Sequence, residues 1–418
     1  MHRTDRAAGF LICCWVALLP VQFEVGTLGL PFRLAPSDLA LAGYLLVRLP
    51  RLRHVPRAWS SWLLALPPVM GLGMLVVYAR TGALGQYAYL QKGFGLLLLL
   101  AAFCCLVDHV DSWDRLRRLL RVFVVSVVVN ALVAVVAFVP AAVGGPVLPL
   151  LNEPYPGVRL TGLLIDPNAF GGLVSVALLV VLVTARPVPL LGGVWRWAAG
   201  PVLAIALLLT FSRSAWIGFA CGVLVLGLCR PLAAAVPLRR LAVGGFAAVP
   251  LLAVALFAVV PDAVRMIQRP DQVQSRVDII GDAMAEFVTS PVVGIGIGGY
   301  EARHGLIVHN TVLWFLTELG LVGLLVLLGL LWSVGSRLLA AHRLAPTAER
   351  TLVLGLLAGH ASMVGLSMGI EAFYQRHWWL VMALGAAAWV LCTAPPRAAG
   401  ADPQPAGADP WLVRGPAG

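Results

Sequence analysis

Long runs of apolar residues with no polar face constrain this sequence more than any other feature. Residues 94–103 and 321–332 are apolar on every side of a helix, whereas a membrane β-strand alternates polar and apolar residues. Of the 418 residues, 60% are hydrophobic and 12% charged, against about 45–50% and about 25% in soluble domains. The sequence therefore predicts an all-α protein that lies in a lipid bilayer.

Charged residues and Pro/Gly clusters divide the chain into about twelve candidate spans of about 20 residues or fewer. We expect helices near residues 9–30, 36–48, 59–79, 93–107, 119–140, 162–185, 197–212, 214–229, 240–260, 309–332, 351–370 and 376–393. Residues 1–393 would form one polytopic membrane domain, and residues 394–418 a disordered cytoplasmic tail. The first span is interpreted as a retained anchor, because no small-residue cleavage site follows it.

The distribution of basic residues predicts the orientation of these spans. Cytoplasmic loops of membrane proteins carry an excess of Arg and Lys, and placing both termini in the cytoplasm puts 20 of the 30 basic residues inside. The net charge of +11 then needs no nucleic acid partner. The stretch between Arg196 and Arg230 is interpreted as two short helices that meet at residues 211–214, which leaves Arg213 at a turn recessed below the outer surface.

One long extracytoplasmic loop, residues 261–308, is expected between the ninth and tenth spans. Apolar residues recur in it at helical spacing from Val273 to Phe287, while Asp278 and Asp282 fall on the opposite side. This pattern predicts a helix that lies along the membrane surface with its acidic face toward water.

Glycines follow this expected surface helix. Residues 294–299 contain a formal G-x-G-x-x-G, but no strand–helix–strand unit surrounds it, so we interpret it as a tight backbone passage rather than a dinucleotide site. The seven cysteines have no ligand spacing and predict neither disulfides nor zinc. We expect no metal and no cofactor.

Several arginines gather on the predicted outer side, where charges near a membrane need a reason. For Arg213, a recessed guanidinium is best explained by an anion partner, since arginine offers a planar fork of donors that matches phosphate. Arg276 flanks the apolar stripe of the surface helix, and a snorkelling side chain is its alternative explanation. Arg159 precedes the polar cluster of Asp166 and Asn168, for which helix capping is the simpler explanation.

A candidate proton acceptor follows the glycines. His309 and Asn310 open the tenth span, and Glu318 lies more than two turns later. A lone histidine is more often a cap or a hydrogen-bonded core residue, but an unperturbed pKa of about 6.5 suits proton transfer.

Four segments taken together resemble the O-antigen ligase and O-antigen polymerase superfamily of bacterial envelope proteins. They are Arg159 to Asn168, Leu209 to Gly218, Ser275-Arg276 with Pro291 to Gly298, and His309-Asn310 with Glu318 to Gly323. The resemblance implies a GT-C-like, metal-independent glycosyltransferase at the outer face of the bacterial cytoplasmic membrane. Its donor would be a glycan on undecaprenyl or another polyprenyl diphosphate.

The resemblance also implies roles for individual residues. Arg213 and Arg276 would hold the diphosphate, with Arg159 and Lys92 as further clamps, and His309 would deprotonate the acceptor hydroxyl. Asp166, Asn168, Asn310 and Glu318 would support the site. The acceptor, a lipid, a protein or another carrier-linked glycan, distinguishes a ligase from a polymerase and stays open.

Two other classes of protein compete with this interpretation. A transporter or flippase of lipid-linked saccharides also has about a dozen spans, but transporters usually place polar groups near the midplane. A noncatalytic scaffold of an envelope complex would tolerate loss of the arginines and the histidine.

Overall fold

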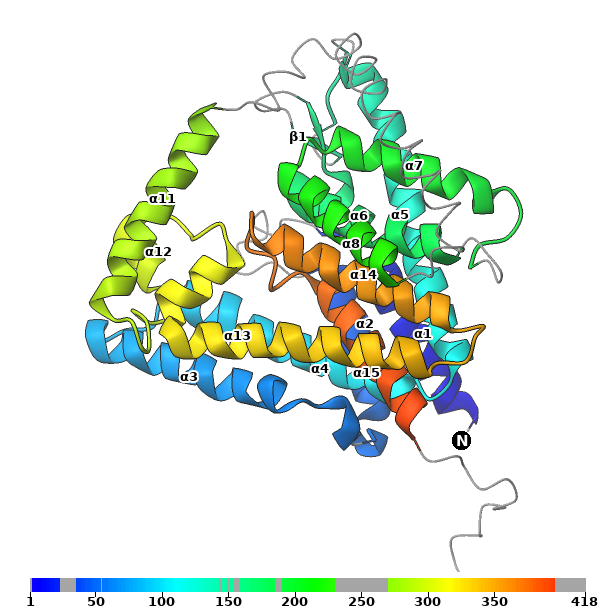
Figure 1. Cartoon of the computed structure of the whole chain (residues 1–418), viewed down its shortest axis with the longest axis horizontal. Coiled ribbons are helices and arrows are strands. Elements are labelled where there is room, and N and C mark those ends of the chain that lie inside the picture. The colour runs from blue at the N-terminus through cyan, green and yellow to red at the C-terminus, as the bar shows by residue number, and fades with distance from the viewer. Residues whose placement is uncertain are drawn as a thin grey trace, which may run out of the picture.

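The described part of the chain is a bundle of helices with one two-stranded hairpin (Figure 1). The computed structural model describes residues 2–22, 35–53, 55–142, 145–148, 151–153, 158–164, 166–184, 190–229 and 270–394. The longer helices in these ranges are α1 (His2–Ala17), α2 (Pro36–Arg48), α3 (Ser61–Thr81), α4 (Gly95–His109), α5 (Trp113–Ala142), α6 (Pro167–Thr184), α7 (Trp195–Leu209), α8 (Arg213–Cys229), α11 (Pro270–Thr289), α13 (Thr311–Leu344), α14 (Arg350–Ser367) and α15 (Arg376–Thr393).

The shorter elements connect and extend these helices. They are the 3-10 helices η2 (Leu49–Arg51), η3 (Pro56–Ala58) and η5 (Gly162–Leu164), the π-helix η4 (Tyr87–Phe94), the helix α12 (Gly299–His304), and the antiparallel strands β1 (Asn152–Glu153) and β2 (Arg159–Leu160). Every predicted span that falls within the described residues contains a helix. The predicted span 240–260, residues 261–269 of the predicted loop and the tail from residue 395 lie outside the described residues.

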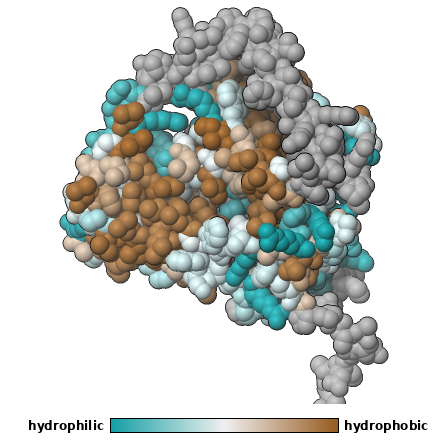
Figure 2. All heavy atoms as spheres, viewed as in Figure 1, coloured by the Kyte–Doolittle hydropathy of each residue, from teal (hydrophilic) through white to brown (hydrophobic). Residues whose placement is uncertain are grey.

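Among the described residues, six helical units are long and apolar enough to cross a membrane. They are α3, η4 continued by α4, α5, α6, α13 and α14. Figure 2 shows a broad hydrophobic surface on the side formed by α3 and α13, where Leu75 and Leu325 are 65% and 60% exposed. Such a surface suits lipid rather than water, so the chain is a multi-pass membrane protein.

Close packing of α8 against α14 organises one half of the bundle. α8 carries Gly218 and Gly222, the small-xxx-small spacing that lets membrane helices approach closely. A Cβ atom on Gly218 would lie 2.5 Å from the carbonyl oxygen of Ser362, and one on Gly222 would lie 2.9 Å from that of Ala358. The contact brings the start of α8 to the end of α14, where Gly369 lies against Ser214.

The helix α11 lies where the sequence predicts an amphipathic helix. In Figure 1 its last turns lie by the left ends of α3 and α13, and the helix extends away from them. Its buried face carries Ile279 and Ala283, and its exposed apolar face carries Val277, Ile280 and Val288, which are 56%, 49% and 72% exposed. We call this end of the molecule the α11 end. The first turn of α1 and the last turns of α13 and α15 lie at the opposite end.

The glycines after α11 make the tight backbone passage that the sequence predicts. Gly294, Gly296 and Gly298 all have positive φ angles, which glycine adopts without steric cost. The N–H of Ile295 donates to the carbonyl of Thr317 (3.0 Å) and that of Gly296 to the carbonyl of Glu318 (3.0 Å). These bonds satisfy carbonyls that α13 leaves free at its kink, where Gly320 has φ 66°.

Replacing Gly218 by alanine tests the α8–α14 contact. The added methyl meets backbone atoms that cannot rotate away, so we expect a loss of about 1–3 kcal/mol of stability, typical of overpacking. The matched control is Gly227→Ala on the same helix, where a Cβ meets nothing within 4 Å and the better helix propensity should leave stability equal or slightly higher. Thermal unfolding in detergent measures both, and equal melting temperatures for the two variants would contradict the contact.

Candidate active site

Arg213 is the first residue of α8. Its half-buried side chain therefore adds a full positive charge to the partial positive charge of a helix N-terminus. Ser212 caps the helix, because its Oγ accepts a hydrogen bond from the N–H of Ala215 (3.2 Å). The predicted division of residues 197–229 into two short helices is confirmed, and it places the arginine at the turn between them.

Arg276 is half-buried on α11. It lies on the same face of the helix as Ala283, a buried residue two turns further along the chain. Burial lowers the pKa of Arg276, the positive charge of Arg213 lowers it further, and Asp166 opposes both. The two guanidinium groups are therefore close enough to repel one another. Among the described residues, neither guanidinium group has a hydrogen-bond or ion-pair partner, and Asp166 is the negative charge that acts on Arg276.

His309 lies at the surface directly before α13, beside this pair. Burial lowers the pKa of His309 below its ordinary value, and the charge of Arg276 lowers it further, while Asp166 and Glu371 raise it. The imidazole is thus held neutral and able to accept a proton at neutral pH.

The backbone around His309 is fixed to the segment that follows α14. Asn310 caps α13 through a hydrogen bond from the N–H of Leu313 to its Oδ1 (3.0 Å), and its Nδ2 donates to the carbonyl of Met368 (2.6 Å). Thr311 donates from its N–H to the carbonyl of Ile370 (3.3 Å) and accepts at Oγ1 from the N–H of Ala372 (2.9 Å). Asn310 therefore positions the histidine.

These backbone contacts place Glu371 near His309. The sequence alone did not single out this residue. Its Oε2 lies 2.6 Å from Nζ of Lys92, while its Oε1 is buried without a hydrogen-bond partner among the described residues. An acidic side chain between two closely spaced spans was the available signal, because such charges are costly near a membrane. The structure shows its proximity to His309, which sequence distance hides.

Lys92 lies beside Glu371, but its side chain is enclosed by protein. The residue is 3% exposed, and its Nζ lies 4.9, 4.5 and 4.4 Å from the ring centroids of Tyr87, Trp314 and Tyr374. Three aromatic faces and Glu371 together compensate the buried ammonium group. In this conformation Lys92 faces protein groups, not a space where a phosphate could bind.

Glu318 supports the glycine passage from within α13. Its Oε2 accepts hydrogen bonds from the N–H of Gly298 (2.9 Å) and from Nε1 of Trp314 (2.7 Å). The carboxylate is 1% exposed, so its contribution is to hold the loop and the aromatic group around Lys92.

Arg159, Asp166 and Asn168 are joined by hydrogen bonds at the start of α6. Asp166 caps α6, because its carboxylate accepts from the N–H groups of Asn168 (3.0 Å) and Ala169 (3.2 Å). The capping explanation for Asp166 is therefore confirmed, although its charge also reaches Arg276 and His309. Arg159 is 4% exposed and donates from Nε to the carbonyl of Thr210 (3.0 Å).

The structure thus brings Arg213, Arg276 and His309 together, with Asp166 and Glu371 as the nearby negative charges. It places Arg159 and Lys92 behind this group, against protein atoms. Within the described ranges, no three His, Cys, Asp or Glu side chains are arranged to hold a metal ion. Chemically, the group offers an anion site next to a neutral base.

These features define a multi-pass membrane protein with a cationic site at one end of its helix bundle. The family model described as O-antigen ligase matches residues 198–328, from α7 into α13, which confirms the resemblance to the O-antigen ligase superfamily over that segment. The match contains Arg213, Arg276 and His309, whereas Lys92, Arg159 and Glu371 lie outside it. No curated protein matches the chain.

The influence of Arg276 on His309 gives a test of the assembled site. Arg276→Gln removes a positive charge, so the pKa of His309 should rise toward about 6.5, and protonation should occur at higher pH than in the wild type. NMR of histidine-labelled protein, with the signal assigned through His309→Ala, measures this titration. Arg303→Gln, which removes the ion pair with Glu286 near the last turn of α11, should leave it unchanged. Identical titrations in Arg276→Gln and the wild type would place Arg276 away from His309.

Proposed function

We propose that the chain transfers a glycan from a polyprenyl diphosphate carrier to an acceptor hydroxyl. The observation that carries the proposal is the pair of arginines, Arg213 and Arg276, which are close enough to repel, form no hydrogen bond or ion pair with the described residues, and adjoin a neutral His309. A bound diphosphate would compensate the two positive charges. The match to the O-antigen ligase family supports glycan transfer as the reaction.

The proposed reaction is a substitution at the anomeric carbon of the donor glycan. The acceptor oxygen forms a bond to this carbon while a ring nitrogen of His309 takes the hydroxyl proton. The bond between the anomeric carbon and the phosphate oxygen breaks, and the polyprenyl diphosphate leaves with the electron pair. Bidentate hydrogen bonds from Arg213 and Arg276 would stabilise the charge that develops on the leaving group. The reaction as proposed consumes no nucleotide and relies on arginines instead of a metal.

Binding of the donor would also prepare the base. The positive charge of Arg276 lowers the pKa of His309, so a bound diphosphate that offsets this charge raises the proton affinity of the imidazole. The histidine is then neutral before the donor binds and more basic when the acceptor must be deprotonated. Glu371, held by Lys92 at 2.6 Å, adds a negative charge that stabilises the imidazolium ion.

We further propose that the α11 end faces the outside of the bacterial cytoplasmic membrane and that both termini lie in the cytoplasm. Arginines cluster at the opposite end, where Arg48 pairs with Asp108 and Arg117 pairs with Glu349. An excess of basic residues favours a cytoplasmic location. Donor glycans would then reach Arg276 from the outer leaflet.

Reconstituted transfer tests the proposal directly. Purified protein in nanodiscs receives undecaprenyl diphosphate-linked glycan and an acceptor, without nucleotide and with EDTA, and the product is detected by mass spectrometry. We expect Arg213→Ala, Arg276→Ala and His309→Ala each to lower turnover by about 10²-fold or more, the scale of a lost acid–base or charge-stabilising group. Arg276→Lys should restore little of the turnover, because an ammonium group lacks the planar set of donors of a guanidinium group.

The controls separate catalysis from folding and from transport. Arg303→Ala, an arginine of α12 outside the site, should turn over like the wild type. Wild-type rates in all three site variants would eliminate the mechanism. Two acceptors, a lipid-linked core saccharide and a second carrier-linked glycan, distinguish a ligase from a polymerase, and movement of the donor across proteoliposomes without product would indicate the flippase alternative.

Glu371→Gln tests the contribution of the carboxylate beside His309. We expect kcat to fall by about 10²-fold with little change in KM, because an amide cannot stabilise the imidazolium charge. The acid limb of the pH–rate profile should move to lower pH, since Glu371 raises the pKa of His309.

Glu349→Gln is the matched control for this substitution. Glu349 has the same 13% side-chain exposure as Glu371 and pairs with Arg117 at 2.7 Å, but at the opposite end of the bundle. It should leave kcat and the pH profile unchanged. A Glu371→Gln variant whose acid limb stays at the wild-type pH would assign Glu371 a structural role only.

A further inference from the structure

The turn that presents Arg213 has a strained backbone. Among the described residues, Phe211 is the one non-glycine residue with a positive φ, 48°, and its side chain is fully buried. A left-handed conformation is unfavourable for a bulky residue and persists only where surrounding contacts enforce it. Hydrogen bonds on both sides of Phe211 provide that enforcement.

Arg159 holds the residue before the strained position. Its Nε donates to the carbonyl of Thr210 (3.0 Å), and its Nη2 donates to Oδ1 of Asn168 (3.4 Å). Thr210 also accepts at Oγ1 from the N–H of Ser212 (3.2 Å). The guanidinium therefore connects the end of α7 to the first turn of α6.

Asn168 holds the residue after the strained position. Its Oδ1 accepts from Oγ of Ser212 (2.8 Å) as well as from Arg159, and Ser212 is the cap from which α8 and Arg213 begin. Asp166 fixes the Asn168 amide from the other side through Nδ2 (3.0 Å). The tie from Arg159 to Ser212 thus spans the turn that ends at Arg213.

Burial distinguishes Arg159 from Arg213. Arg159 is 4% exposed, and its guanidinium donates to protein oxygens, whereas Arg213 is half-buried and its charge acts on Arg276. We propose that Arg159 is a positioning residue that holds the α7–α8 turn and so directs the Arg213 guanidinium at the diphosphate. This inference rests on the proposed function, and it replaces the prediction that Arg159 itself contacts phosphate.

The geometry of the fork makes the proposal specific to arginine. Nε and Nη2 reach two acceptors on different segments at once, which a single ammonium group cannot reproduce. Arg159→Lys keeps the positive charge but loses one of the two hydrogen bonds. It therefore separates a positional role from a purely electrostatic one.

A double-mutant cycle with inorganic pyrophosphate as the probe tests the proposal. Its Kd is measured by calorimetry on the full chain in detergent for the wild type, Arg159→Lys, Arg213→Ala and the double variant. We expect each single variant to raise Kd by about tenfold or more, and the double variant to bind no more weakly than Arg213→Ala, because residues that act through one another are not additive. Turnover of the lipid-linked donor should show the same pattern.

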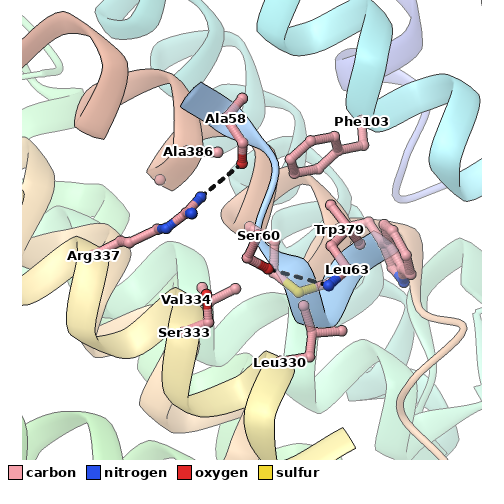
Figure 3. Close-up of a pocket in the computed structure, with 12 residues that line it drawn as sticks. Ala58, Ser60, Leu63, Phe103, Leu330, Ser333, Val334, Arg337, Trp379 and Ala386 are labelled. Carbon is pink, nitrogen blue, oxygen red and sulfur yellow. Dashed lines mark hydrogen bonds between the residues drawn. The ribbon is translucent and has the colours of Figure 1, made fainter. Parts of the chain in front are cut away.

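Arg337→Lys is the matched control. Arg337 also donates its guanidinium to backbone carbonyls, those of Ala58 and Trp59 (both 2.9 Å), but it does so beside a small pocket between α3, α13 and α15 at the opposite end (Figure 3). This substitution should leave Kd unchanged. Asn168→Ala, which removes the shared acceptor, should weaken binding in the same direction as Arg159→Lys and keeps the test informative if the lysine variant unfolds.

The possible outcomes separate the inference from the proposed function. Additive losses in the double variant would make Arg159 a direct phosphate ligand and overturn the positioning role. Wild-type Kd in Arg159→Lys and in Asn168→Ala would overturn it as well. If Arg213→Ala itself binds pyrophosphate like the wild type, the arginine clamp of the proposed function fails, and the inference fails with it.

Discussion

Backbone-to-backbone packing of α8 against α14 is the contact on which the arrangement of the site depends. Lipid offers no hydrophobic drive for two apolar helices to associate, so association relies on close van der Waals contact and on small residues that permit it. Gly218 and Gly222 provide this closeness against the carbonyls of α14. The start of one helix and the end of the other then meet, which places Arg213 near the segment that anchors His309.

Charge is the second constraint, because each ionised group removed from water must be compensated. Two groups at the α11 end differ in this respect. The ammonium group of Lys92 is enclosed by three aromatic rings and paired with Glu371. The guanidinium groups of Arg213 and Arg276 form no ion pair with the described residues, and this difference is the basis on which we propose that they bind a diphosphate.

Hydropathy alone predicted most of the helices, because an apolar run that must satisfy its backbone in lipid has few alternatives. The bounds of α2 and α15 match those expected, and so does the turn before Arg213. α13 extends to Leu344 rather than ending near residue 332, because its last turns are polar and leave the apolar pattern. The predicted helix at residues 240–260 lies outside the described residues.

The site was less accessible to sequence reasoning than the helices. Arg213, Arg276 and His309 could be nominated because each is a charge or base with no local partner. Whether a charged side chain is available to a ligand depends on partners distant in sequence. Arg159 donates to the carbonyl of Thr210, and Lys92 pairs with Glu371. Glu371 was missed for the same reason: its importance comes from hydrogen bonds between Thr311 and residues 370–372, which no spacing rule predicts.

One consequence follows from the exposed apolar face of α11. Val277, Ile280 and Val288 are available to acyl chains, while Arg276 on the same helix belongs to the site. Under the proposed function, the lipid that contacts these side chains and the donor that Arg276 binds would therefore meet on one helix, so the lipid composition of the membrane would be a physical variable of the reaction.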